Sequence, residues 1–142
     1  MKIKMLAFLF LPMFVYGGVE KNKEIVVQFY ELAFNKHRPV EAVKKYVSHK
    51  YVQHSPNIAD GEMALLEYLK GRIQENPKSK VEIKHVIAED DLVVLHLLSK
   101  KNKNDRGEAI IDIFKVKDSK IVEHWDVSQL VPEKTKNDNS MF

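Results

Sequence analysis

Cysteine is absent from this chain of 142 residues, and glycine is scarce, at five residues. Without cysteine the protein can form no disulfide, no thiolate nucleophile and no thiolate metal site. The few glycines make no phosphate-binding loop, no dinucleotide-binding pattern and no nucleophile elbow. These absences argue against kinase, dehydrogenase and hydrolase functions, so any chemistry must come from His, Asp, Glu, Tyr, Lys or Ser side chains.

The first eighteen residues differ in composition from the rest of the chain. Lys2 and Lys4 precede an apolar run over residues 5–15, and the segment holds no acidic residue. The run is shorter than the ~20 residues that span a bilayer as a helix. It predicts a signal peptide, residues 1–18, cut after Gly17 or Gly18. We therefore expect export to the periplasm or medium, with no membrane contact after cleavage; a retained N-terminal helix that packs on the domain is the alternative.

Loss of this segment would remove two lysines and leave 21 basic and 20 acidic residues, which lowers the formal net charge from +3 to +1. A nearly neutral mature chain gives no reason to expect a nucleic-acid partner. The length suits one domain. We place this domain at residues 19–131, followed by a C-terminal tail at residues 132–142 that is rich in Lys and Asn.

Helical periodicity dominates the first half of the mature chain. Apolar residues recur at helical spacing over residues 24–35, and Pro39 suits the entrance of a short second helix. Residues 51–54 form an extended stretch that ends in turn residues. Asp60 is a candidate N-cap for a third helix, whose predicted buried stripe is Met63, Leu66, Leu69 and Ile73.

From Lys80 the apolar period changes from 3.6 to 2, which indicates strands. Four strands follow, at about residues 80–86, 92–99, 108–116 and 121–131, and their short connections predict antiparallel pairing. Residues 92–99 are apolar on both faces, as in a central strand covered on both sides. The predicted fold class is α+β, with three N-terminal helices packed on a curved four-stranded antiparallel sheet.

Strand alternation puts acidic and histidine side chains among apolar ones. Asp112 shares a face with Phe114, and His124 shares a face with Asp126 in the last strand. A carboxyl group on a dry face is costly to ionise, so its pKa tends to rise. These residues are candidates for an active site, although a buried ion pair between Asp126 and His124 would be a purely structural explanation.

Two further histidines are candidates for the same site. His96 shares a strand face with Val94, and it would join Asp112 and the last strand if the strand faces agree. His54 precedes a Ser-Pro-Asn turn. A satisfied core histidine and a turn cap are the respective structural alternatives. Any tyrosine whose hydroxyl points inward could donate a proton.

Three stretches together resemble the SnoaL-like branch of the nuclear transport factor two superfamily. They are residues 51–57 with Asp60-Gly61, residues 112–116, and residues 120–127 with their His-Trp-Asp motif. The resemblance implies a cone-shaped α+β barrel that is often dimeric through its sheet, hence a homodimer. SnoaL-type cyclases close polyketide rings by intramolecular aldol condensation without metal or cofactor, with an aspartate as acid and base. Asp126 is the matching aspartate.

The leading hypothesis is a cofactor-independent acid–base enzyme, of the aldol cyclase, lyase or isomerase type, acting on a small apolar carbonyl compound. Asp126 would take the proton α to the carbonyl, and His124, His54 or His96 would donate a hydrogen bond to the enolate. Asp112 would orient one of the histidines. The side chains predicted to bind the ligand are His96, Phe114 and Val94.

Two alternatives remain open at this point. A non-catalytic protein could bind a small apolar ligand in the same pocket. A metal site could form from His54, His96, His124 and an aspartate, since imidazole and carboxylate suit zinc or iron, although no compact His-x-x-x-His spacing supports it. An export signal is not what a polyketide biosynthetic enzyme needs, so the substrate stays open.

Overall fold

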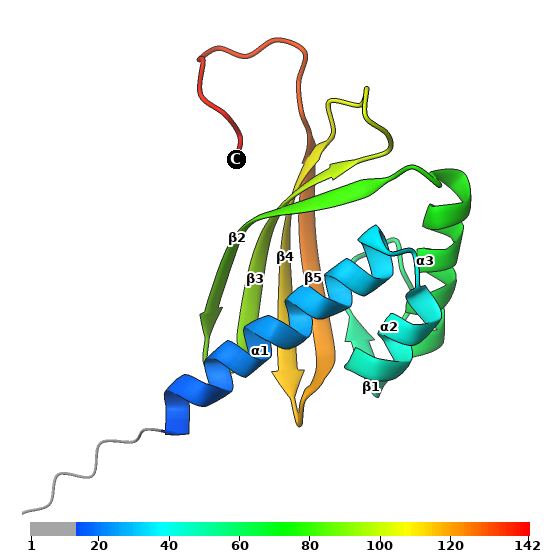
Figure 1. Cartoon of the computed structure of the whole chain (residues 1–142), viewed down its shortest axis with the longest axis vertical. Helices are drawn as coiled ribbons and strands as arrows, with labels where there is room; N and C mark the ends of the chain where they lie inside the picture. Colours follow the sequence, from blue (N-terminus) through cyan, green and yellow to red (C-terminus); the bar gives the residue numbers. More distant parts are fainter. Residues whose placement is uncertain (1–13) are drawn as a thin grey trace, which may run out of the picture.

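The computed structural model describes residues 14–142, so most of the predicted signal peptide, residues 1–13, lies outside the described part. Three helices pack on one face of a five-stranded sheet (Figure 1). The elements are α1 (Phe14–Tyr30), the π-helical turn η1 (Glu31–Asn35), α2 (Pro39–Tyr46), β1 (Val47–Gln53), α3 (Glu62–Glu75), β2 (Lys80–Glu89), β3 (Leu92–Lys100), β4 (Glu108–Lys117) and β5 (Lys120–Leu130).

The sheet is mixed, with strand order β1-β5-β4-β3-β2, which corrects the predicted four-stranded antiparallel sheet. Strands β2 to β5 are antiparallel as expected, and β1 adds a fifth strand parallel to β5. The sequence predicted only an extended stretch at residues 51–54 and not the whole strand β1. The register of β1 with β5 breaks between Val47 and Val52. Polar residues fill that interval, so the strand shows no regular period of two.

Helix α1 runs obliquely across the inner face of the sheet and ends in the turn η1 (Figure 1). Ile25, Val26 and Phe29 are buried on its inner side, as the predicted periodicity requires. At the end of η1 the Asn35 side chain donates to the carbonyl oxygen of Val81 and accepts from the Val81 N–H, both at 2.9 Å. Asn35 thus supplies the edge strand β2 with the two hydrogen bonds that a further strand would otherwise make.

Helix α3 differs from its prediction at its start. Gly61, with φ of +96°, occupies the N-cap position instead of Asp60. The Asp60 carboxylate accepts the N–H of Gln53 at 2.7 Å and so satisfies the free edge of β1. The buried residues are Leu65, Leu66 and Leu69, whereas Met63 is 61% exposed. Leu66 and Leu69 of the predicted stripe are therefore buried as expected, and Leu65 takes the place predicted for Met63.

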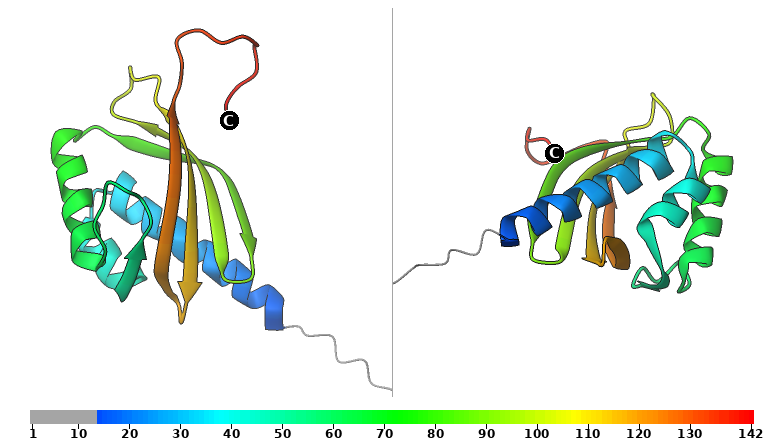
Figure 2. Two further views of the ribbon diagram at one scale, coloured as in Figure 1. Left: turned by 180° about the vertical axis from the view of Figure 1, so that it is seen from behind. Right: turned by 60° about the horizontal axis from the view of Figure 1, so that its bottom comes forward.

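The core lies between the helices and the inner face of the sheet. Val93, Leu95 and Leu97 of β3 are fully buried there. The outer side chains Val94 and His96 are half-buried, and no described helix lies over that face (Figure 2, left). The prediction that this strand is covered by elements on both sides is therefore wrong.

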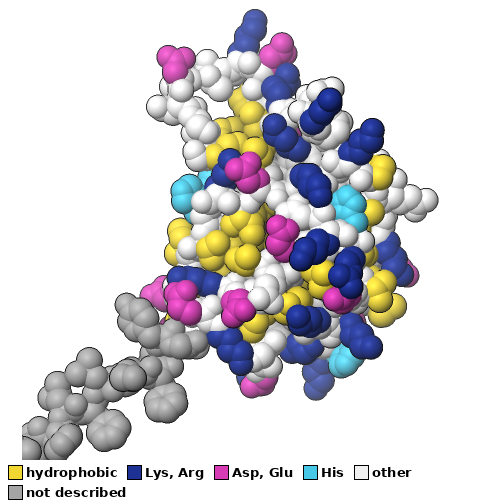
Figure 3. Space-filling model, in the orientation of Figure 1, with side chains coloured by type: hydrophobic (Ala, Val, Ile, Leu, Met, Phe, Trp, Pro, Cys, Tyr) yellow, Lys and Arg dark blue, Asp and Glu magenta, His cyan; other side chains and the backbone are white. Residues whose placement is uncertain are grey.

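The C-terminal tail follows β5 as an exposed segment that turns back toward the sheet (Figure 1). Its last residue, Phe142, stacks on His96 of the outer face with ring centroids 5.4 Å apart. On the opposite face of the molecule, Lys and Arg side chains crowd the right-hand half of the view in Figure 3. None of the described helices combines the length and apolar character that a membrane span requires.

Candidate functional site

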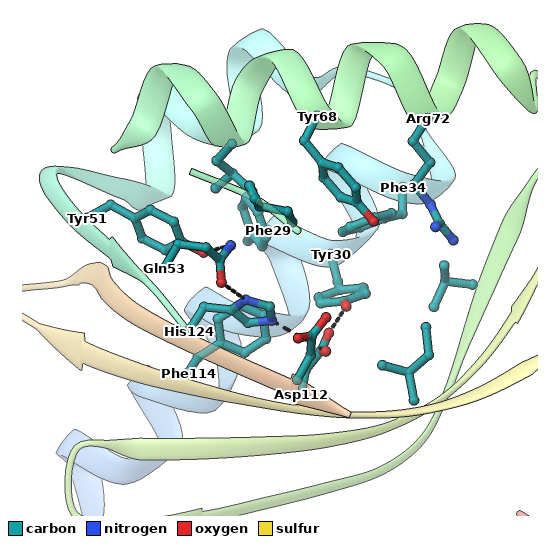
Figure 4. Close-up of a pocket in the computed structure, with 15 residues that line it drawn as sticks. Phe29, Tyr30, Phe34, Tyr51, Gln53, Tyr68, Arg72, Asp112, Phe114 and His124 are labelled. Carbon is teal, nitrogen blue, oxygen red and sulfur yellow. Dashed lines mark hydrogen bonds and ion pairs between the residues drawn. The ribbon is translucent and has the colours of Figure 1, made fainter. Parts of the chain in front are cut away.

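A small cavity lies between the helices and the inner face of β4 and β5 (Figure 4). Its volume of about 60 Å³ is room for a few water molecules or one small chemical group. Aromatic and aliphatic side chains form most of the wall, and a few polar side chains point inward. The residues that line the cavity include Phe34, Tyr51, Gln53, Arg72, Asp112 and Asp126.

Two aspartates meet across the central strands. The register of β4 and β5 pairs Asp112 with Asp126 and Phe114 with His124, so all four side chains face inward. One ligand atom each of Asp112, His124 and Asp126 lies within 4.8 Å of the others. Of the four residues predicted to converge on one concavity, the structure brings Asp112, His124 and Asp126 together, with Phe114 beside them, and leaves out His96.

Asp112 is the more enclosed aspartate, with 2% of its surface exposed. The Tyr30 hydroxyl donates to Oδ2 of Asp112, and His124 Nε2 lies 3.4 Å from Oδ1. Burial raises the pKa of the Asp112 carboxyl; the contact with His124 opposes this rise, and the charge of Asp126 adds to it. The contact with His124 matches the orienting role predicted for Asp112, whose function remains a hypothesis.

A chain of hydrogen bonds fixes the other side of His124. The Ser55 N–H donates to Gln53 Oε1 at 3.0 Å, so this oxygen is an acceptor, and His124 Nδ1 lies 2.8 Å from it. The Nδ1 atom therefore carries the proton. The Nε2 atom faces Asp112, so both ring nitrogens of His124 have protein partners.

The same chain of hydrogen bonds leaves the hydroxyl proton of Tyr51 available as a hydrogen-bond donor. Gln53 Nε2 donates to the Tyr51 oxygen at 3.0 Å, so Tyr51 accepts from Gln53 and its own O–H is available to another acceptor. Burial raises the pKa of the Tyr51 hydroxyl, and the charge of Asp126 raises it further. Tyr51 thus stays protonated at neutral pH and presents a hydrogen-bond donor to the cavity.

The structure does not bring His54, His96 or Val94 into the cavity. The register of β3 and β4 pairs Leu95 with Asp112, so His96 and Val94 point to the outer face. The prediction assumed that His96 and Asp112 lie on the same face of the sheet. The observed register differs from this assumption by one residue, which puts the two side chains on opposite faces. His54 follows Gln53 and points outward as well, where it stacks on Trp125 at 4.4 Å and contacts Glu123 at 3.2 Å.

Gln53 and Arg72 were missed as members of the site, and Tyr51 was covered only by the expectation that a tyrosine with an inward hydroxyl could donate a proton. Gln53 and Tyr51 lie on the irregular strand β1, where no period indicated an inward face. Arg72 lies on α3, seven residues after Leu65 and three after Leu69, both of which are buried. That spacing places Arg72 on the inward face of the helix and could have identified it.

A metal site made of His54, His96 and His124 is excluded by these positions, since only His124 faces the cavity. Asp112, His124 and Asp126 could still offer one ligand atom each to a divalent cation. Two carboxylates and an imidazole suit such an ion chemically. The same groups suit proton transfer.

The sequence matches a known protein family over most of its length. The pattern of the SnoaL-like domain matches residues 26–124, which include Tyr51, Asp112 and His124. The chain belongs to the SnoaL-like domain family. Asp126 lies two residues beyond the matched segment, on the same strand as His124. A comparison with curated proteins gave no match.

Solved structures share the fold of this SnoaL-like chain. A proposed polyketide cyclase from Acidithiobacillus ferrooxidans is 22% identical, with a TM-score of 0.67 over 76% of this chain and 87% of that one. A proposed SnoaL-like polyketide cyclase from Jannaschia is 13% identical, with a TM-score of 0.66 over 78% and 87%. An NTF2-like protein of unknown function from Mesorhizobium loti is 16% identical, with a TM-score of 0.64 over 78% and 93%. These likenesses establish the cone-shaped α+β fold.

Proposed function

We propose that this SnoaL-like protein is an acid–base enzyme of the cyclase, lyase or isomerase type that acts on a small carbonyl compound without a cofactor. The observation that carries the proposal is the Asp112–Asp126 pair inside a largely apolar cavity. One oxygen of each carboxyl lies within 4.8 Å of the other, and burial raises the pKa of the Asp112 carboxyl, a rise to which the charge of Asp126 adds. Asp112 therefore tends to keep its proton.

Asp126 is the base in this proposal. It lines the cavity and is half-buried, and no group in the described part of the chain donates a hydrogen bond to its carboxylate. Asp112, in contrast, is held by Tyr30 and His124. Asp126 therefore removes the proton α to the substrate carbonyl, and Asp112 acts as a positioning residue for His124.

Tyr51 donates the hydrogen bond to the carbonyl oxygen as the enolate forms. This replaces the role first considered for the histidines, because both ring nitrogens of His124 are occupied. A neutral hydroxyl in a dry site stabilises a developing oxyanion well. In an aldol reaction the enolate carbon then bonds to a second carbonyl carbon, and Asp126 returns its proton to the alkoxide that results. In an isomerisation Asp126 returns the proton to another carbon of a conjugated enolate.

The test is exchange of α-protons in D2O, followed by proton NMR on 2-pentanone and on straight-chain oxo acids. We expect Asp126→Asn to slow exchange by about 10²–10⁴-fold, and Tyr51→Phe by about 10²–10³-fold. The control is Asp118→Asn: Asp118 is exposed in the β4–β5 turn with φ of +51°, a conformation that Asn tolerates. Undiminished exchange in Asp126→Asn would contradict the assignment of the base.

A second candidate function is a binding protein that uses the same cavity. It is favoured by the saturated hydrogen bonds of Asp112 and His124, which suit a rigid recognition site as well as an active one. The two functions differ in one result. A binding protein would take up the oxo acids without any exchange above that of buffer.

We also propose that the protein is exported. Among the side chains that the structure describes, the first buried one is Ile25, so a cut after Gly17 or Gly18 would leave the described core whole. Edman sequencing of the protein recovered outside the cytoplasm should start at Gly18 or Val19. Recovery only from the cytoplasm, with residue 1 in place, would contradict export.

A further inference from the structure

We propose that the substrate carries a carboxylate and that Arg72 binds it at the end of the cavity away from His124 and Gln53. Figure 4 shows the Arg72 guanidinium at that end, on the far side of the Tyr30–Asp112 pair. The inference rests on the proposed function for the chemistry at Asp126, whereas the binding of the anion stands on Arg72 itself. The substrate class becomes a small oxo acid.

The Arg72 side chain is fixed in place by two contacts. Its Nη2 donates to Ser99 Oγ of β3 at 2.5 Å. Its guanidinium carbon lies 5.6 Å from the centroid of the Phe34 ring, which is a cation–π distance. A guanidinium held in this way is already oriented for a planar partner, so little rotamer entropy is lost when an anion binds.

The charge of Arg72 lacks a partner within the protein. Among the side chains described, those of residues 18–142, Arg72 Nε is the one buried nitrogen or oxygen without a hydrogen bond, and no carboxylate lies within 4.0 Å of the guanidinium. A buried donor without an acceptor costs about 1–3 kcal/mol. An unpaired group of this kind in a cavity wall indicates an acceptor that arrives with the ligand.

Arg72 also lies at a boundary between two cavities. It lines a second, more polar cavity of about 80 Å³ together with Ser99, Lys101 and Asp105. The first cavity is mostly apolar and contains Asp126. A carboxylate on Arg72 would sit at this boundary and leave the rest of the ligand, with its carbonyl group, in the apolar cavity.

A carboxylate fits this position better than a phosphate does. Arg72 is the only Lys or Arg side chain that lines the first cavity among the described residues. One guanidinium matches the charge and the planar fork of one carboxylate, whereas a phosphate dianion would need a second cation. Lys101 lines the second cavity, but Asp105 and Glu108 line it too and offset its charge. The cavity of about 60 Å³ also limits the ligand to a short carbon chain.

The experiment measures binding of straight-chain oxo acids of four to six carbons, levulinate among them, and of their methyl esters by isothermal titration calorimetry. We expect at least one acid to bind about 10–100-fold more tightly than its ester, as a charge-assisted hydrogen bond implies. Arg72→Met should abolish this preference, and Arg72→Lys should keep part of it. The control Lys70→Met removes an exposed charge from the same helix and should change nothing.

Three results would overturn the inference: equal binding of acid and ester, an unchanged preference in Arg72→Met, or no binding of any acid at about 10 mM. If Arg72→Met fails to fold, Arg72→Lys decides, because it keeps the charge and loses the fork. Asp126→Asn separates the two proposals. Acid binding that survives in this variant, with no exchange in the wild type, would end the proposed enzymatic function and leave the Arg72 inference standing.

Discussion

The protonation of Asp112, a residue of the candidate site, also affects the stability of the domain. Its carboxyl is enclosed by Tyr30, His124 and Asp126, and burial raises its pKa. A carboxyl whose pKa is higher in the folded state binds its proton more tightly there than in the unfolded chain. Its contribution to stability is therefore greatest below the ordinary pKa of about 4 and is lost as pH rises through the folded value.

Asp112→Asn should remove this dependence. The amide can still accept from Tyr30 and can donate to His124 Nε2, so we expect the variant to be about 1–4 kcal/mol more stable than the wild type at pH 8 and little changed at pH 4. Thermal unfolding followed by circular dichroism at both pH values measures the difference. A loss of stability of similar size at both would show instead that Asp112 is ionised and paired with a charged His124.

Single residues of the site were predictable where a regular strand carried them. Asp112, His124 and Asp126 follow from alternation within β4 and β5, and their pairing needs only a tight turn between the strands. The prediction for His96 was wrong because its face depends on the register of the β3–β4 hairpin. A one-residue shift in this register moves the side chain to the other face of the sheet. Arg72 reaches the cavity because segments that are distant in the sequence pack together. Helical periodicity can show only that Arg72 lies on the inward face of its helix, not which residues it contacts there.

At the scale of elements, Asn35 joins the end of η1 to the edge strand β2. Asn35→Ala would leave the N–H and the carbonyl oxygen of Val81 without these partners, and we expect a loss of about 1–3 kcal/mol in the free energy of unfolding. Asn22→Ala is the matched control, since its single bond to Asp90 is exposed, and it should cost less than about 0.5 kcal/mol. Urea unfolding of both variants measures this, and equal effects would argue against the link.

Element types were easier to predict than element partners. The three helices and the strands β2 to β5 follow from the change of apolar period near Lys80. Strand β1 was visible only as a short extended stretch, because its polar middle and its broken register depend on β5. Asp60 was assigned to a helix cap on local grounds, yet its carboxylate serves the backbone of β1.

At the scale of the whole molecule, the outer face of the sheet is partly apolar, and of the described residues only the C-terminal tail packs on it. Val127 is 70% exposed and Ile87 is 64% exposed, and no described helix covers this face (Figure 2, left). A patch of this kind favours association. We propose that two copies pair through this face, as the family resemblance implies.

Val127→Lys should then yield a monomer, because pairing would bury a charge against a second copy. Met63→Lys is the control, since Met63 is also largely exposed, at 61%, but lies on α3. Light scattering coupled to size-exclusion chromatography reports the mass of each variant. A wild-type protein of monomer mass would contradict pairing through the sheet.

The parallel strand also governs the order in which the chain can complete its fold. Val47 pairs with Ile121 and Gln53 with His124, so β1 finds its partner only after residues 120–130 are available. Such distant pairing is slow to form compared with hairpins and helices. A nascent chain that lacks this last segment holds the described helices and most of the sheet, but it lacks Asp126, the proposed base, and His124 of the cavity wall. The proposed activity would thus be acquired only at the end of synthesis, or after passage through a membrane under the proposed export.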